Sequence, residues 1–164
     1  MTASKISPPR WALLGLVLGV GALSPARALA KPDPFMGTWV LNLAKSTFTP
    51  GPAPKTQTAV YKAVAGGVQV TATGTDGDGK AMHLQYTAKF DGKDYPVTGS
   101  ADYDATVLKR VDLHTIQFTR KKAGKVVQTG TIVVTMDGKT RTVTADGTNA
   151  RGEHIHNVSV YDKK

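Results

Sequence analysis

Apolar and polar residues alternate along much of the chain, which is the pattern of a β-strand with one buried face. The alternation is clearest in residues 82–90, where the apolar face carries Met82, Leu84, Tyr86, Ala88 and Phe90. The run stops at Asp91-Gly92, a pair typical of a tight hairpin turn. Residues 82–90 are therefore predicted to form a strand whose apolar face points toward a core.

Comparable runs follow one another along the chain, separated by glycine-containing turns such as Gly66-Gly67 and Asp137-Gly138. Three prolines in residues 50–54 predict a connection without regular structure. Pro96 restricts its short run to an edge or rim. No segment carries a capped apolar stripe of helical period, so little helix is expected. The predicted strands are residues 38–42, 56–64, 68–73, 82–90, 94–97, 105–112, 115–120, 126–136, 140–145 and 153–161.

These strands, joined mostly by short hairpins, predict an all-β fold: a single antiparallel up-and-down β-barrel of about 8–10 strands. A sandwich is the alternative, but it usually needs long crossovers between its sheets, and only a closed barrel removes exposed strand edges. We expect the interior to be lined by the apolar residues Leu84, Tyr86, Phe90, Val107, Phe118, Ile132 and Val134.

The first thirty residues differ in kind from the rest. Lys5 and Arg10 precede an apolar run from Trp11 to Leu23, and a small-residue stretch ends at Ala30. This is the pattern of a Sec-type signal peptide, residues 1–30, cleaved after Ala30 or, as a second choice, after Ala28. An uncleaved anchor is the alternative, but the run is shorter than the roughly 20 residues that cross a bilayer. We expect a periplasmic or secreted domain of residues 31–164 with no stable membrane insertion.

Charge and cysteine content narrow the possible partners. The predicted leader contains three basic residues and no acidic one, so its removal lowers the formal charge from +9 to +6. The remaining basic residues are scattered, and the densest group, Arg120-Lys121-Lys122, borders a predicted turn, so no nucleic-acid partner is expected. The chain has no cysteine, which excludes a thiol nucleophile, a lipoprotein anchor and disulfides. We expect a monomer.

The segment Phe35-Met36-Gly37-Thr38-Trp39 resembles the start of the first strand in the lipocalin, fatty-acid-binding and avidin barrels, the calycin group. The resemblance implies that Trp39 plugs the closed end of the barrel. The ending around Tyr161 resembles the last strand of the fatty-acid-binding branch, where an Arg-x-Tyr pair holds the ligand's carboxylate, although Ser159 stands at the arginine position. The chain is also similar, over nearly all of residues 31–164, to a set of small exported bacterial proteins, which implies a fold and no chemistry.

Motifs for metal binding and catalysis are weak. His154 and His156 lie two apart on a predicted strand, so they share a face and are candidate metal ligands if a third group approaches. Solvent-facing polar residues of an alternating strand explain them as well. The chain contains no Gly-x-Ser-x-Gly, His-Glu-x-x-His or phosphate-binding glycine loop, and Asp102 and Asp104 are explained by a solvated loop. We therefore predict no enzyme and no cofactor.

Two arginines share a strand face with apolar residues: Arg120 with Ile116 and Phe118, and Arg141 with Val143. If these faces are interior, each charge needs a partner there. The alternative places each arginine at a barrel mouth with its head in water.

Together these features favour non-covalent binding of a small apolar or amphipathic ligand inside the barrel. The predicted contacts are Tyr61, Leu84, Tyr86, Phe90, Phe118, Arg141 and Tyr161. The alternative is a barrel filled by its own side chains that serves as an envelope protein-interaction or stress module. The first hypothesis predicts an apolar cavity of at least about 300 Å³, and the second predicts none.

Overall fold

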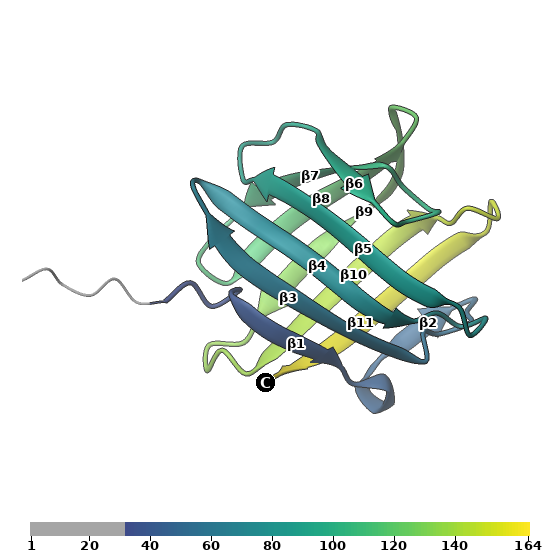
Figure 1. The fold of residues 1–164 in the computed structure, drawn as a ribbon, viewed down its shortest axis with the longest axis horizontal. Helices are drawn as coiled ribbons and strands as arrows, with labels where there is room; N and C mark the ends of the chain where they lie inside the picture. Colours follow the sequence, from purple (N-terminus) through teal and green to yellow (C-terminus); the bar gives the residue numbers. More distant parts are fainter. Residues whose placement is uncertain (1–31) are drawn as a thin grey trace, which may run out of the picture. The chain divides into compact units, whose positions relative to one another are not determined.

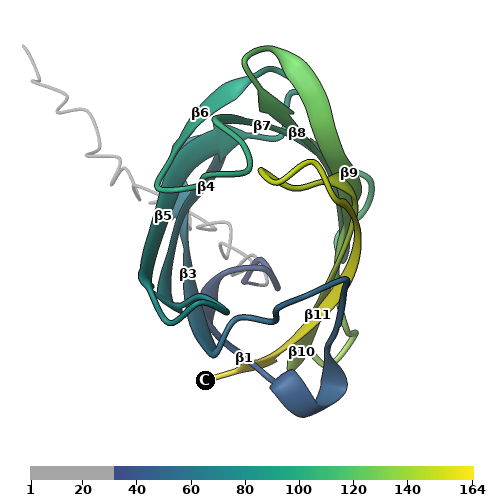
Figure 2. The same ribbon diagram turned by 90° about the vertical axis from the view of Figure 1, so that its right-hand side faces the viewer.

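The computed structural model describes residues 32–164, and these fold into a closed antiparallel β-barrel (Figures 1 and 2). The predicted signal peptide lies outside the described residues. The described part contains no helix long and apolar enough to span a membrane. Its strands are β1 (Gly37–Leu41), β2 (Thr47–Thr49), β3 (Thr56–Val64), β4 (Gly67–Thr75), β5 (Ala81–Lys89), β6 (Tyr95–Thr98), β7 (Ala105–Arg110), β8 (Thr115–Lys122), β9 (Lys125–Val134), β10 (Thr140–Thr148) and β11 (His154–Lys163).

From β3 to β11 each strand pairs with the next in the sequence, and β1 pairs with both β3 and β11. The ring therefore contains ten strands joined up and down, which confirms the predicted fold class. The seam between β1 and β11 is short, with three residue pairs from Trp39–Lys163 to Leu41–Tyr161. Further toward its start, β11 pairs with β2 over three residues, His156–Val158.

Strand β2 was not predicted, and it follows from an interruption of the first strand. The 3-10 turn η1 (Leu43–Lys45) separates β1 from β2, yet both strands lie along β11. At the break the Ser46 hydroxyl donates to the Asn42 carbonyl (2.7 Å) and accepts from the Val160 amide (2.9 Å). A side chain thus replaces one rung of the backbone ladder, which keeps this amide hydrogen-bonded.

Alternation along the strands places one face of each strand inside the ring. Trp39, Val70, Leu108, Ile116 and Val134 are all within the buried core. One predicted interior residue is wrong: Val107 lies on the opposite face of β7, because Thr106 and Leu108 are the buried residues of that strand. The run contains adjacent apolar residues at 107 and 108, so alternation alone allowed either register.

At two glycines, Gly37 and Gly130, the added Cβ atom of any other residue would come too close to a neighbouring side chain. Gly37 has φ +121°, and a Cβ there would lie 2.9 Å from the Lys163 side chain. Gly130 is paired with Phe118, and a Cβ there would lie 2.5 Å from its ring. The missing side chain at Gly130 makes room for Phe118 across the strand pair, where the ring faces the barrel interior.

Candidate functional site

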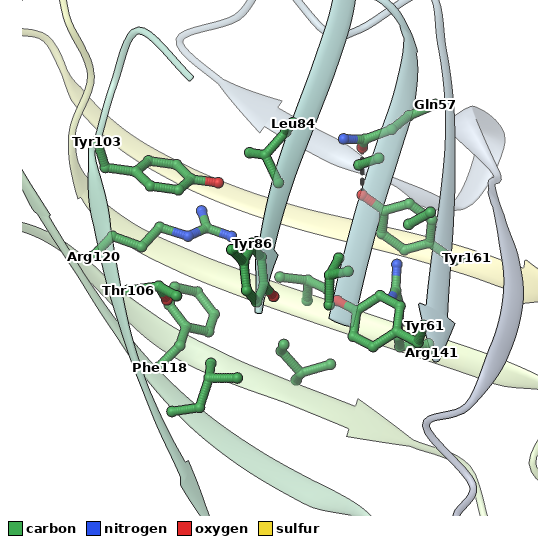
Figure 3. Close-up of a pocket in the computed structure, with 16 residues that line it drawn as sticks. Gln57, Tyr61, Leu84, Tyr86, Tyr103, Thr106, Phe118, Arg120, Arg141 and Tyr161 are labelled. Atoms are coloured by element: carbon green, nitrogen blue, oxygen red, sulfur yellow. Dashed lines mark hydrogen bonds between the residues drawn. The ribbon is translucent and has the colours of Figure 1, made fainter. Parts of the chain in front are cut away.

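The barrel encloses a cavity of about 70 Å³. Six of the seven predicted ligand contacts line it: Tyr61, Leu84, Tyr86, Phe118, Arg141 and Tyr161 (Figure 3). Ten further residues complete the lining, among them Gln57, Tyr103, Thr106 and Arg120. The seventh predicted contact, Phe90, is not part of the lining; it is half-buried and packs against the core elsewhere.

The cavity volume is well below the roughly 300 Å³ that the hypothesis of a small apolar or amphipathic ligand predicts, so this expectation about the cavity is wrong. The large side chains of Tyr86, Tyr103, Arg120 and Arg141 fill much of the barrel in this region (Figure 3). The interior is therefore neither an open lumen nor fully packed.

Arg141 is a charged residue in the barrel interior, with 1% of its surface exposed. Its guanidinium carbon lies 4.2 Å from the ring centre of Tyr161, 4.5 Å from that of Tyr61 and 5.2 Å from that of Trp39. Neither Nε nor Nη1 has a hydrogen-bond partner among the described residues. The alternative of a head group in water at a barrel mouth is wrong for Arg141.

Arg120 is the second charged residue of the lining, and it is half-buried. It donates to Gln128 Oε1 (2.9 Å) and lies between two rings, 4.4 Å from the centre of Phe118 and 4.5 Å from that of Tyr103. Gln128 is the cross-strand neighbour of Arg120, next to a register shift between β8 and β9. The residues that hold Arg120 are therefore all neutral.

Tyr103 is a lining residue that the sequence did not indicate, because it lies in the connection between β6 and β7. Its two neighbours tie this connection to other turns. The Asp102 carboxylate accepts from the Ala150 amide (2.8 Å), and the Asp104 carboxylate accepts from the Ala123 amide (3.0 Å). The expectation that a solvated loop explains both aspartates is incomplete, since they hold Tyr103 over Arg120.

Burial affects the ionisation of three tyrosines that line the cavity. Burial raises the pKa of Tyr86 well above its ordinary value, and nearby Tyr61 and Tyr103 add to the effect. Burial also raises the pKa of Tyr103 and of Tyr161. The Tyr161 hydroxyl donates to Gln57 Oε1 (2.5 Å). Among the described residues that line the cavity there is no carboxylate, so two positive charges stand without an anion.

A second group of residues closes the barrel near Trp39. The Trp39 indole N–H donates to the Phe35 carbonyl (2.9 Å), and both side chains are fully buried. Arg110 pairs with Asp33 (2.6 Å), and its guanidinium stacks on Phe35 and Phe90. The segment that precedes β1 is thereby fixed to the barrel wall. Phe90, a predicted ligand contact, belongs to this group.

His154 and His156 lie together on an exposed part of β11. Both rings contact the Asp146 carboxylate, His156 Nδ1 at 3.0 Å and His154 Nε2 at 3.3 Å. Within residues 32–164 no group of three or more His, Cys, Asp or Glu side chains is arranged to hold a metal ion. This pair faces away from the cavity, whose lining contains neither histidine.

No family model and no curated protein matches the chain. Among solved structures the chain is similar to "Structure of a redesigned beta barrel, mFAP1, bound to DFHBI". The two share 15% identity with a TM-score of 0.41, over 79% of this chain and 95% of that chain. The class defined by strand pairing is a ten-stranded up-and-down barrel with a small cationic cavity.

Proposed function

We propose that this protein binds a small amphipathic molecule with an anionic group, non-covalently, inside the barrel. The observation that supports the proposal is Arg141, a buried cation whose Nε and Nη1 lack partners within the described chain. A buried charge is costly unless an opposite charge or hydrogen bonds compensate it. An anion at this guanidinium would supply both, and the surrounding aromatic rings would contact the apolar part.

The size of the cavity limits the ligand. The cavity of about 70 Å³ is smaller than the roughly 150 Å³ that holds a benzene ring, so a single-ring aromatic acid requires the lining side chains to shift, and a long acyl chain requires larger movements. The predicted small apolar or amphipathic ligand is thereby narrowed to a compact one. Burial raises the pKa of Tyr86 and of Tyr103, so their hydroxyl groups stay protonated and can donate to a carboxylate, whereas the Tyr161 hydroxyl already donates to Gln57.

The proposal includes export and a binding role. The basic head, the apolar run and the small residues before Ala30 support a cleaved signal peptide and a periplasmic or secreted location. The lack of recognisable catalytic motifs in the sequence supports binding rather than catalysis. We propose that the protein acts as a monomer.

The test compares benzoate with benzamide, its neutral match in shape, in thermal unfolding and calorimetric titration. We expect benzoate to raise the unfolding midpoint and benzamide to have little effect. At 100 times its Kd, a ligand adds about 2.7 kcal/mol to the free energy of unfolding. Native mass spectrometry of the protein purified from a host that expresses the full chain would detect a co-purified ligand. No response to a panel of small aromatic and aliphatic acids, with no retained mass, would contradict the proposal.

A second candidate is a filled barrel that acts through its outer face as an envelope interaction or stress module. The small cavity favours it. The two candidates differ at Arg141: the filled barrel predicts that Arg141→Gln leaves the response to benzoate and other anions unchanged, because such anions never enter the interior.

A further inference from the structure

The cavity contains two cationic groups that are held separately. Arg141 lies among Trp39, Tyr61 and Tyr161, whereas Arg120 lies between Tyr103 and Phe118. The two sets of rings have no member in common. In Figure 3 the two arginines lie on opposite sides of the drawn cavity, with Tyr86 in the space between them.

Neither positive charge has a counter-ion in the part of the chain that the structure describes. The ion pairs there do not include Arg120 or Arg141. Ionised tyrosines could balance them, but burial raises the pKa of three tyrosines of the lining. A monoanionic ligand would therefore leave one guanidinium uncompensated in a site of low dielectric constant.

The two groups are nevertheless close enough for one small molecule to reach both. Both arginines are among the residues that line the same cavity of about 70 Å³. The wall of the cavity that both arginines line also includes the apolar side chains of Leu84, Ile132 and Val143. A flat or short hydrocarbon spacer matches this wall.

We infer that the ligand is a compact dicarboxylate, with one carboxylate at Arg141, the other at Arg120 and an apolar spacer between them. The inference rests on the proposed function and specifies the ligand class of the same cavity. The deeper carboxylate would accept from the free Nε and Nη1 of Arg141. The other would accept from Arg120, which is tied to Gln128 at its other side.

The alternative occupant is a single carboxylate bridged by both guanidinium groups. It would require Arg120 to leave Tyr103 and Phe118, or Arg141 to leave its three rings. Because these cation–π contacts would be lost, the separated arrangement is favoured.

The experiment compares benzene-1,4-dicarboxylate with its monomethyl ester, which has a nearly identical framework and one charge fewer. Calorimetric titration at fixed ionic strength gives both Kd values. We expect the dicarboxylate to bind at least about tenfold more tightly than the ester. Arg120→Gln should abolish this preference. Arg151→Gln, a change at an exposed arginine paired with Glu153, should leave the preference intact.

Three outcomes separate the inference from the proposed function. Equal Kd values for the two probes, with binding still dependent on Arg141, would overturn the dicarboxylate and retain the anion site. A preference that survives Arg120→Gln would also overturn it. Failure of both probes and of benzoate would overturn the inference and the proposed function together. Arg120 is only half-buried, so Arg120→Gln is expected to fold. This variant still tests the inference if Arg141→Gln does not fold.

Discussion

At the scale of a single residue, two opposing effects act on the Arg141 guanidinium: contact with aromatic rings stabilises it, and burial away from water destabilises it. Three aromatic rings attract the guanidinium, each by about 0.5–2 kcal/mol. Against this stands the loss of hydration, which costs several kcal/mol for an ion removed from water. Because Nε and Nη1 are unpartnered, we expect the loss of hydration to outweigh the attraction. The buried charge is therefore expected to lower the free energy of unfolding of the ligand-free protein.

Replacing the charge by an apolar chain of similar length should stabilise the ligand-free protein. We expect Arg141→Met to raise the free energy of unfolding by about 1–3 kcal/mol, measured by chemical denaturation. The same variant should lose its response to benzoate. A matched change at Arg110, which stacks on two rings but pairs with Asp33, should act in the opposite direction, by about 1 kcal/mol. If both variants were destabilised, the rings would outweigh the desolvation.

Cavity residues could be predicted from the sequence in those strands whose apolar and polar residues alternate regularly. Arg141 shares its face with Val143, and Tyr86 shares its face with Leu84, so their inward direction follows from the period of two. Tyr103 could not be found in this way, since it lies outside the strands and reaches the cavity through contacts of Asp102 and Asp104 with distant turns.

At the scale of an element, the interrupted first strand depends on one hydroxyl. Ser46 completes the ladder between β1, β2 and β11 by accepting from the Val160 amide and donating to the Asn42 carbonyl. No period in the sequence indicates that a strand continues after a 3-10 turn, which explains why β2 was missed. The long strands were predictable because their alternation covers many residues.

We expect Ser46→Ala to lower the free energy of unfolding by about 1–2 kcal/mol, because the part-buried Val160 amide loses its acceptor. Hydrogen exchange at that amide should accelerate in the same variant. Thr47→Ala, a change at an exposed residue of β2, provides the control and should stay within about 0.5 kcal/mol. Equal effects of the two changes would show that Ser46 is not needed at the break.

At the scale of the whole molecule, closure of the ring buries several tyrosines, and this couples stability to pH. Burial raises the pKa of Tyr86, Tyr103 and Tyr161 above the ordinary value of 10.0. Below that value the folded and unfolded chains both hold these protons. Above it the unfolded chain releases them while the folded barrel retains them, so the unfolded state is favoured.

The contribution of these tyrosines to stability should therefore be constant through neutral pH and fall as pH rises beyond about 10, the ordinary pKa of tyrosine. Denaturant unfolding at a series of alkaline pH values measures the fall, and tyrosinate absorbance shows whether ionisation accompanies unfolding. Tyr86→Phe should reduce the slope. Stepwise ionisation without loss of structure would contradict the prediction.

The position of Trp39 has an optical consequence. It is the only tryptophan in residues 32–164, its indole is fully buried, and its ring lies 4.8 Å from the Lys163 ammonium and 5.2 Å from the Arg141 guanidinium. The emission of an indole responds to the electric field across its ring. An anion that neutralised Arg141 would change that field, so the wavelength and lifetime of the emission would report occupancy of the cavity. The barrel thus carries its own fluorescent reporter at the seam where its first and last strands meet.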